Sequence, residues 1–245
     1  MRWLDGSASA PGVPGASGRA FDCEREGQRI PGLLWLPEAA AGPVPLVLVQ
    51  HGGSGHKGDA SVLELVAAFT ARGLAVAAID GLLHGDRRAA PLDKASLLEA
   101  FLAFWRSGGR REALIADWLV VIEQLRALPA LAGQALGWCG LSMGTAYGLG
   151  VLARCPALVA AVIGKWSAHY PASAALLDDA RRVRAATLFV QHWDDELFDR
   201  QGTLDVFGAL ASPDKRLWAC PGGHFGRSAE ELALSVDFLA QRLKA

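Results

Sequence analysis

The sequence predicts an α/β fold, a mostly parallel doubly wound sheet with helices on both faces. Short apolar runs alternate with longer helical patterns along the chain, as in successive βαβ units. Several of these runs are apolar throughout, which is typical of strands buried on both faces of a parallel sheet. The length of 245 residues is enough to bury a large core without disulfides or metals.

Composition narrows the class of protein. Hydrophobic residues make up 51% of the chain and the formal charge is −1, which gives no electrostatic basis for binding nucleic acid or an anionic membrane. The longest apolar runs are far shorter than the roughly 20 residues that span a bilayer. Cys23, Cys139, Cys155 and Cys220 show no paired spacing, so we expect reduced thiols and a cytoplasmic location. A homodimer is compatible with this composition.

The beginning of the chain differs from the rest. Residues 1–20 are rich in Gly, Ala, Ser and Pro and are predicted to form a flexible N-terminal arm. They contain no apolar segment of the kind found in signal peptides. Residues 21–245 show no linker and no repeat, and we predict a single domain for them.

The first half of that domain alternates strands and helices. A strand over 30–36 is ended by Pro37, and a wholly apolar strand follows over 46–50. Asp59 stands at the N-cap of a helix that reaches about residue 72, where Gly73 ends it. The next predicted elements are a strand over 75–80 and helices over 94–105 and 111–128.

The second half continues the alternation. The predicted elements are strands over 135–139, 159–164, 187–192 and 215–220, and helices over 145–154, 173–182, 203–210 and 229–243. The 22 residues from Lys165 to Ala186 are too few for an independent lid domain. We therefore expect a site that is open or covered only by loops and by the 94–105 helix.

One turn carries the first candidate for catalysis. The segment GLSMG, residues 140–144, joins a predicted strand to a predicted helix. Its glycines permit a sharp bend that projects the Ser142 hydroxyl at the carboxyl edge of the sheet, where sites in such folds lie. The Met143 amide, at the start of a helix, can donate to an oxyanion. A structural Gly-Ser turn is the alternative, and the strand-turn-helix context favours a nucleophile.

A serine nucleophile needs a base, and the base needs an acid that orients it. His224 follows the predicted 215–220 strand in the segment PGGHF. Asp194 and Asp195 follow the 187–192 strand, in the order Ser, acid, His that this architecture uses. Only one of two adjacent carboxylates can face His224, and these residues alone leave the choice open.

A second glycine-rich segment, QHGGSG, follows the 46–50 strand. Glycines there let backbone amides approach a substrate oxygen, as a second oxyanion-hole donor must. A phosphate-binding loop is excluded because the G-x-x-x-x-G-K-[ST] spacing is absent. His51, His56 and His84 lie on two loops without metal-ligand spacing, so we predict neither a metal nor another cofactor.

The ordered set QHGGSG, GLSMG, HWDDELF and GGHF resembles the α/β-hydrolase family over about residues 45–225. The length and the run HGGSGHKGD look like the compact dienelactone-hydrolase-like and prolyl-oligopeptidase-like serine esterases. Dienelactone hydrolases use a cysteine nucleophile, whereas this chain has Ser142 in that place. The resemblance implies an α/β-hydrolase domain and hydrolysis of carboxylic esters.

The resemblance also implies roles for single residues. It implies a triad of Ser142, His224 and Asp195, because Asp195 fits the family pattern G-x-x-D-x-x-(apolar), with His192 at the glycine position. The family's oxyanion amides correspond to Gly53 and Met143.

The sequence gives weaker indications about the substrate. Trp166, His169 and Trp193 lie on loops at the expected edge and are candidates for a pocket that binds a small-molecule ester. Phe101 and Phe104 fit either a pocket or the core. Two alternatives to an esterase stay open: a peptidase or thioesterase of the same fold, and a ligand-binding protein without turnover.

Overall fold

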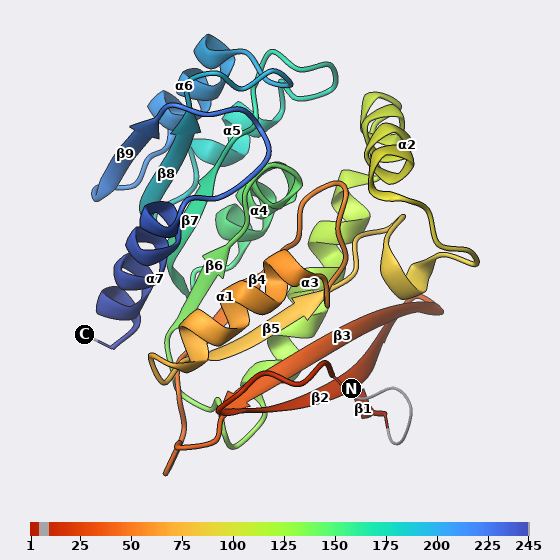
Figure 1. Cartoon of the computed structure of the whole chain (residues 1–245), viewed down its shortest axis with the longest axis vertical. Helices are drawn as coiled ribbons and strands as arrows, with labels where there is room; N and C mark the ends of the chain where they lie inside the picture. The colour runs from red at the N-terminus through yellow and green to blue at the C-terminus, as the bar shows by residue number, and fades with distance from the viewer. Residues whose placement is uncertain (5–9, 245) are drawn as a thin grey trace.

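A nine-stranded sheet forms the centre of the computed structural model, which describes residues 1–4 and 10–244 (Figure 1). The strand order is β1-β2-β3-β5-β4-β6-β7-β8-β9; the six strands from β5 to β9 along this order are parallel, and β1 to β3 are antiparallel. The predicted fold class is thereby confirmed. The strands are β1 Arg2–Trp3, β2 Ala16–Arg25, β3 Gln28–Pro37, β4 Leu46–Val49, β5 Ala75–Ile79, β6 Leu136–Cys139, β7 Leu158–Gly164, β8 Ala186–His192 and β9 Lys215–Cys220.

Helices lie on both faces of the sheet (Figure 1). One face carries α1 Ala60–Thr70 and α7 Ala229–Leu243, which contact each other and the central strands. The other face carries α3 Arg111–Arg126, α4 Met143–Arg154, α5 Leu176–Ala180 and α6 Arg200–Ala209. The 3₁₀ helix η2, Gly85–Arg87, follows β5, and α2, Lys94–Arg106, lies beyond the edge of the helix layer and packs Phe101 and Trp105 against Tyr147 of α4 (Figure 1).

The core is divided by the sheet into two apolar layers. In β4, Leu46 and Leu48 belong to the layer under α3 and α4, while Val47 and Val49 belong to the layer under α1 and α7. Successive side chains of a strand point to opposite faces, so a strand covered on both sides must be apolar at every position. This explains why the run Leu46–Val49 shows no alternation.

Most predicted elements occur within a few residues of their expected bounds. Asp59 caps α1 by accepting a hydrogen bond from the Val62 amide at 3.0 Å, as the pattern indicated. The predicted 173–182 helix is reduced to α5, because Ala172 takes a positive φ of 63° and the Ser173 hydroxyl accepts hydrogen bonds from two buried tryptophans.

The expectation of a flexible arm over residues 1–20 needs correction. Arg2–Trp3 pairs with β2, and β2 itself begins at Ala16 and pairs with β3 along its whole length. Residues 5–9 of the expected arm lie outside the described residues. The hairpin carries no strong sequence signal, because its two-residue turn, Glu26-Gly27, has positive φ at both positions without the usual Asn-Gly or Asp-Gly pair.

The turn provides a stability test of this hairpin. Gly27 has φ +74°, and a Cβ there would meet no atom within 4 Å, so a substitution acts through backbone conformation alone. We expect Gly27→Ala to lower the free energy of unfolding by about 1 kcal/mol, measured by urea denaturation. Gly42→Ala is the matched control, because Gly42 also has open space and no positive φ. Equal stability of the two variants would contradict the assigned turn.

Candidate active site

Ser142 lies at the sharp turn between β6 and α4. Its backbone takes φ 57° and ψ −120°, a conformation that non-glycine residues rarely adopt. The flanking glycines make the bend sterically feasible, since a Cβ on Gly144 would lie 2.9 Å from the Gln50 carbonyl oxygen and one on Gly140 would lie 2.9 Å from the Gly144 Cα. The Ser142 amide donates to the Gly164 carbonyl at 3.0 Å. The turn is thus fixed between β4 and β7.

His224 connects Ser142 to a carboxylate. Its Nε2 lies 3.0 Å from Ser142 Oγ, and its Nδ1 lies 2.9 Å from Asp195 Oδ2. An ionised carboxylate only accepts, so Nδ1 carries a proton and Nε2 is free to accept from the serine hydroxyl. The structure therefore brings together the three residues that the sequence analysis singled out.

Asp195, and not Asp194, faces the histidine. Burial acts to raise the Asp195 pKa, but hydrogen bonds from His224 and from the amides of Phe198 and Leu197 outweigh it, so the pKa lies below its ordinary value. Asp194 is exposed and accepts from the Gly222 amide at 2.9 Å. Asp194 thus holds the loop that precedes His224.

Two residues outside the predicted set fix the backbone of His224. His192 Nδ1 donates to the Gly223 carbonyl at 2.7 Å, and the His224 amide donates to Glu196 at 2.7 Å. Both polar atoms of the Gly223–His224 peptide are therefore held by side chains, one from the last residue of β8 and one from the segment after it. His192 is itself held by Glu231 of α7 at 2.8 Å. The sequence signal for the contact between His192 and the Gly223 carbonyl was that His192 occupies the position where the family pattern has glycine.

The loop after β4 is held by two buried histidines. The Gly81 amide donates to His51 Nε2 at 3.0 Å, so His51 Nδ1 carries the proton and donates to the Gly52 carbonyl at 2.8 Å. His84 Nε2 donates to the Gly53 carbonyl at 3.0 Å. Burial lowers the pKa of both imidazoles, to about 3 for His84, so both are neutral at pH 7.

A buried ion pair anchors the far end of this loop. The Lys57 ammonium and amide both bond to Asp80 at the end of β5, at 2.6 and 3.0 Å, and the ammonium also bonds to Asp86 at 2.6 Å. In the described part of the chain, the amides of Gly53 and Met143 donate to no protein acceptor. They are therefore free to bind an oxygen atom of a ligand.

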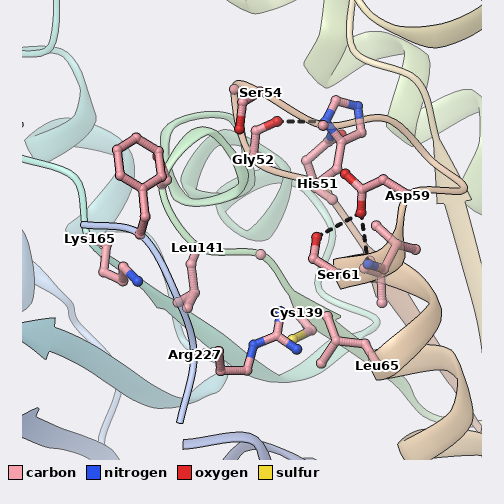
Figure 2. Close-up of a pocket in the computed structure, with 18 of the residues that line it drawn as sticks. His51, Gly52, Ser54, Asp59, Ser61, Leu65, Cys139, Leu141, Lys165 and Arg227 are labelled. Atoms are coloured by element: carbon pink, nitrogen blue, oxygen red, sulfur yellow. Dashed lines mark hydrogen bonds between the residues drawn. The ribbon is translucent and has the colours of Figure 1, made fainter. Parts of the chain in front are cut away.

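A cavity of about 410 Å³ surrounds Ser142 and His224. Figure 2 shows His51, Gly52 and Ser54 of the glycine-rich loop across the cavity from Lys165 and Leu141. Among the described residues, no group of three or more His, Cys, Asp or Glu side chains is arranged to hold a metal ion.

Trp166, His169 and Trp193 were predicted to line the substrate pocket, and the structure places all three outside the cavity at Ser142. Trp166 is fully buried, packs edge-to-face against Trp105 and at a tilt against Phe198, and donates to the Ser173 hydroxyl. The His169 ring lies between Asp199 and Asp205 on the surface, and Trp193 stacks under the Arg200 guanidinium. None of the three lines the cavity at Ser142, as far as the described residues define it. The sequence places these three residues on loops at the carboxyl edge of the sheet, but it does not specify the direction in which each side chain points.

Comparison with solved structures identifies the family. A cold-adapted esterase from an Arctic intertidal metagenomic library, in a polyethylene-glycol-bound complex, is 32% identical to this chain with a TM-score of 0.87, and the match covers 99% of this chain and 100% of that one. The native form of that esterase matches at 30% identity over the same shares, with a TM-score of 0.82. The chain belongs to the α/β-hydrolase family.

More distant α/β-hydrolases share the fold. Acetyl xylan esterase 1 from Thermoanaerobacterium sp. JW/SL YS485 matches with a TM-score of 0.75 at 15% identity, over 98% of this chain and 87% of that chain. No protein-family model and no curated protein matches the chain. The predicted family and the predicted enzyme class, a carboxylesterase-like hydrolase, are confirmed. No helix in the described part of this α/β-hydrolase is long and apolar enough to cross a membrane.

The lowered pKa of the buried His84 makes the free energy of unfolding depend on pH. The unfolded chain binds a proton at His84 near pH 6.5, whereas the folded protein binds it only near pH 3. Between these values the unfolded state holds more protons, so stability falls as the pH falls, by up to about 1.4 kcal/mol per pH unit from His84. We expect His84→Gln to flatten this dependence in urea denaturation between pH 7 and pH 4.5.

The control for this experiment is His56→Gln, which replaces an exposed histidine of the loop after β4. The steep dependence should persist in that variant. A His84→Gln slope equal to that of the wild type would show that His84 is not the group responsible.

Proposed function

We propose that this α/β-hydrolase cleaves small carboxylic esters through an acyl-enzyme on Ser142. In this mechanism His224 Nε2 takes the proton of Ser142 Oγ while the oxygen attacks the ester carbonyl carbon. The Asp195 carboxylate holds the imidazole by its Nδ1 proton and stabilises the positive charge that develops on the ring. The observation that carries the proposal is the pair of hydrogen bonds at 3.0 and 2.9 Å that joins the three side chains.

The oxyanion of the tetrahedral intermediate would be bound by the amides of Gly53 and Met143. Met143 is the first residue of α4, where free amides and the helix dipole favour negative charge. The Gly53 amide shares a peptide with the Gly52 carbonyl, which accepts from the neutral His51, and this contact fixes the amide in advance of the reaction. His224 then gives its proton to the departing alkoxide, and a water molecule, activated by the same imidazole, releases the acid. No step requires a cofactor.

The proposed compartment is the cytoplasm. All four cysteines are free, and three of them are buried. Burial raises the pKa of Cys23 to about 11 and that of Cys139 to about 12, so neither thiol is reactive at neutral pH. Cys139 lies three residues before Ser142 inside β6, where it packs under α1 and α7 instead of acting as the nucleophile.

Removing the proposed nucleophile tests the reaction class. We expect the wild-type protein to hydrolyse p-nitrophenyl acetate and Ser142→Ala to lose activity by about 10⁴-fold or more, measured as initial rates on purified protein. Stoichiometric labelling of the wild type by a fluorophosphonate, read by intact mass, provides an independent check. Hydrolysis that survives in Ser142→Ala would refute the proposed mechanism.

The adjacent aspartates test the proposed acid. We expect Asp195→Asn to lower kcat by about 10⁴-fold, because an asparagine would favour the wrong imidazole tautomer. Asp194→Asn serves as the matched variant and should change kcat little, since Asp194 bonds to a loop amide and not to the ring. The reverse order of effects would assign the role to Asp194.

A further inference from the structure

One side of α2 is buried and the adjacent side is not. Leu97, Phe101 and Trp105 recur at four-residue spacing and are fully or almost fully buried. Leu98 and Leu102 follow them by one position and are only half-buried. They line a groove of about 490 Å³, which we call the α2 groove. It is lined by Ser54, Lys94, Ala95, Leu98, Glu99, Leu102, Arg106 and Phe225.

The α2 groove is continuous with the cavity at Ser142. Four residues line both: Ser54, Lys94, Leu98 and Phe225. Leu98 packs against Gly53, because its Cδ1 lies 3.3 Å from the place where a Cβ on that glycine would be. Phe225 directly follows His224, and their rings lie 5.2 Å apart. One end of the groove therefore opens between the proposed oxyanion amide and the proposed base.

The walls of the groove are apolar and unfilled. Phe225 is 58% exposed and lies next to the half-buried Leu98 and Leu102 in the lining of the groove. Leu98 and Leu102 lie one helical turn apart, so together they present about 6 Å of apolar surface along the helix axis. Lys94, Glu99 and Arg106 add charged groups to the lining, and Arg106 donates to the Tyr170 hydroxyl at 3.0 Å.

We propose that the α2 groove binds the apolar chain of the ester substrate, with Leu98, Leu102 and Phe225 as the residues that set chain-length preference. This inference rests on the proposed function, since a carbonyl held at Gly53 places its substituents next to Leu98. Each methylene that the groove removes from water adds about 0.8 kcal/mol of binding, or about fourfold in kcat/KM. The gain ends where the chain passes Leu102 and reaches Arg106.

The test is a chain-length profile measured in two series. In the first, p-nitrophenyl esters vary the acyl chain from acetate through butyrate and hexanoate to octanoate. In the second, acetate esters of ethanol, butanol and hexanol vary the alcohol. We expect kcat/KM of the wild type to rise with chain length in one series and then level off. The series that responds shows whether the acyl or the alcohol chain occupies the groove.

The variant Leu102→Gln tests whether the groove causes the chain-length preference. A polar side chain of similar length should lower the ratio of kcat/KM for the longest to the shortest ester by about tenfold, the loss expected for one half-buried leucine contact. Leu102→Trp, which fills the groove, should shift the optimum to shorter chains. The ratio is taken within one preparation, so a partly unfolded sample does not change it. Leu119→Gln is the matched control, because Leu119 is a half-buried helical leucine on α3, outside the groove.

Each outcome separates this inference from the proposed function. Loss of acetate hydrolysis in Ser142→Ala together with an unchanged ratio in both Leu102 variants would retain the esterase and overturn the groove. A wild-type kcat/KM that does not change with chain length in either series would also overturn the groove proposal and leave the esterase proposal intact. Hydrolysis that persists in Ser142→Ala would refute the proposed function itself, whatever the chain-length profile.

Discussion

The backbone conformation of Ser142 is the constraint on which the rest of the site depends. A serine at φ 57° and ψ −120° costs of the order of 1–3 kcal/mol and persists only where its surroundings hold it. Here the surroundings are the Gly164 carbonyl, which accepts the Ser142 amide, and the Gln50 carbonyl, which leaves no room for a side chain at position 144. This conformation leaves the Ser142 hydroxyl 3.0 Å from His224 Nε2 and the Met143 amide at the first position of α4.

The remaining polar groups of the site are fixed by hydrogen bonds to side chains from several elements. His51 and His84 are neutral and bind carbonyls of the glycine-rich loop, while Lys57 and Asp80 form an ion pair at its end. His192 and Glu196 hold the two polar atoms of the Gly223–His224 peptide. Because these contacts exist before substrate binds, the proposed oxyanion donors and base need little reorganisation during the reaction.

Substrate selection depends on a different part of the chain. The sheet and its covering helices fix the reacting groups, whereas α2 and the residue after His224 form the apolar groove beside them. The 21-residue connection between β7 and β8, residues 165–185, forms α5 and loops and leaves the cavity without a separate lid domain. An architecture of this kind lets the groove change with a few substitutions in α2 while the elements that hold Ser142 and His224 stay the same.

The sequence by itself determined the α/β class, nearly all strands and helices, and the residues Ser142 and His224, because wholly apolar runs, caps and glycine-flanked turns are local signals. It singled out Asp195 through the family pattern, while the tertiary structure decided which of the two aspartates faces the ring. Only the tertiary structure placed Trp166 in the core, His169 and Trp193 on the surface, and β1 and β2 in the sheet. It alone brought His192 and Glu196 to the His224 peptide. The physical reason is that these outcomes depend on side-chain direction and on contacts between segments far apart in the chain, which no local pattern specifies.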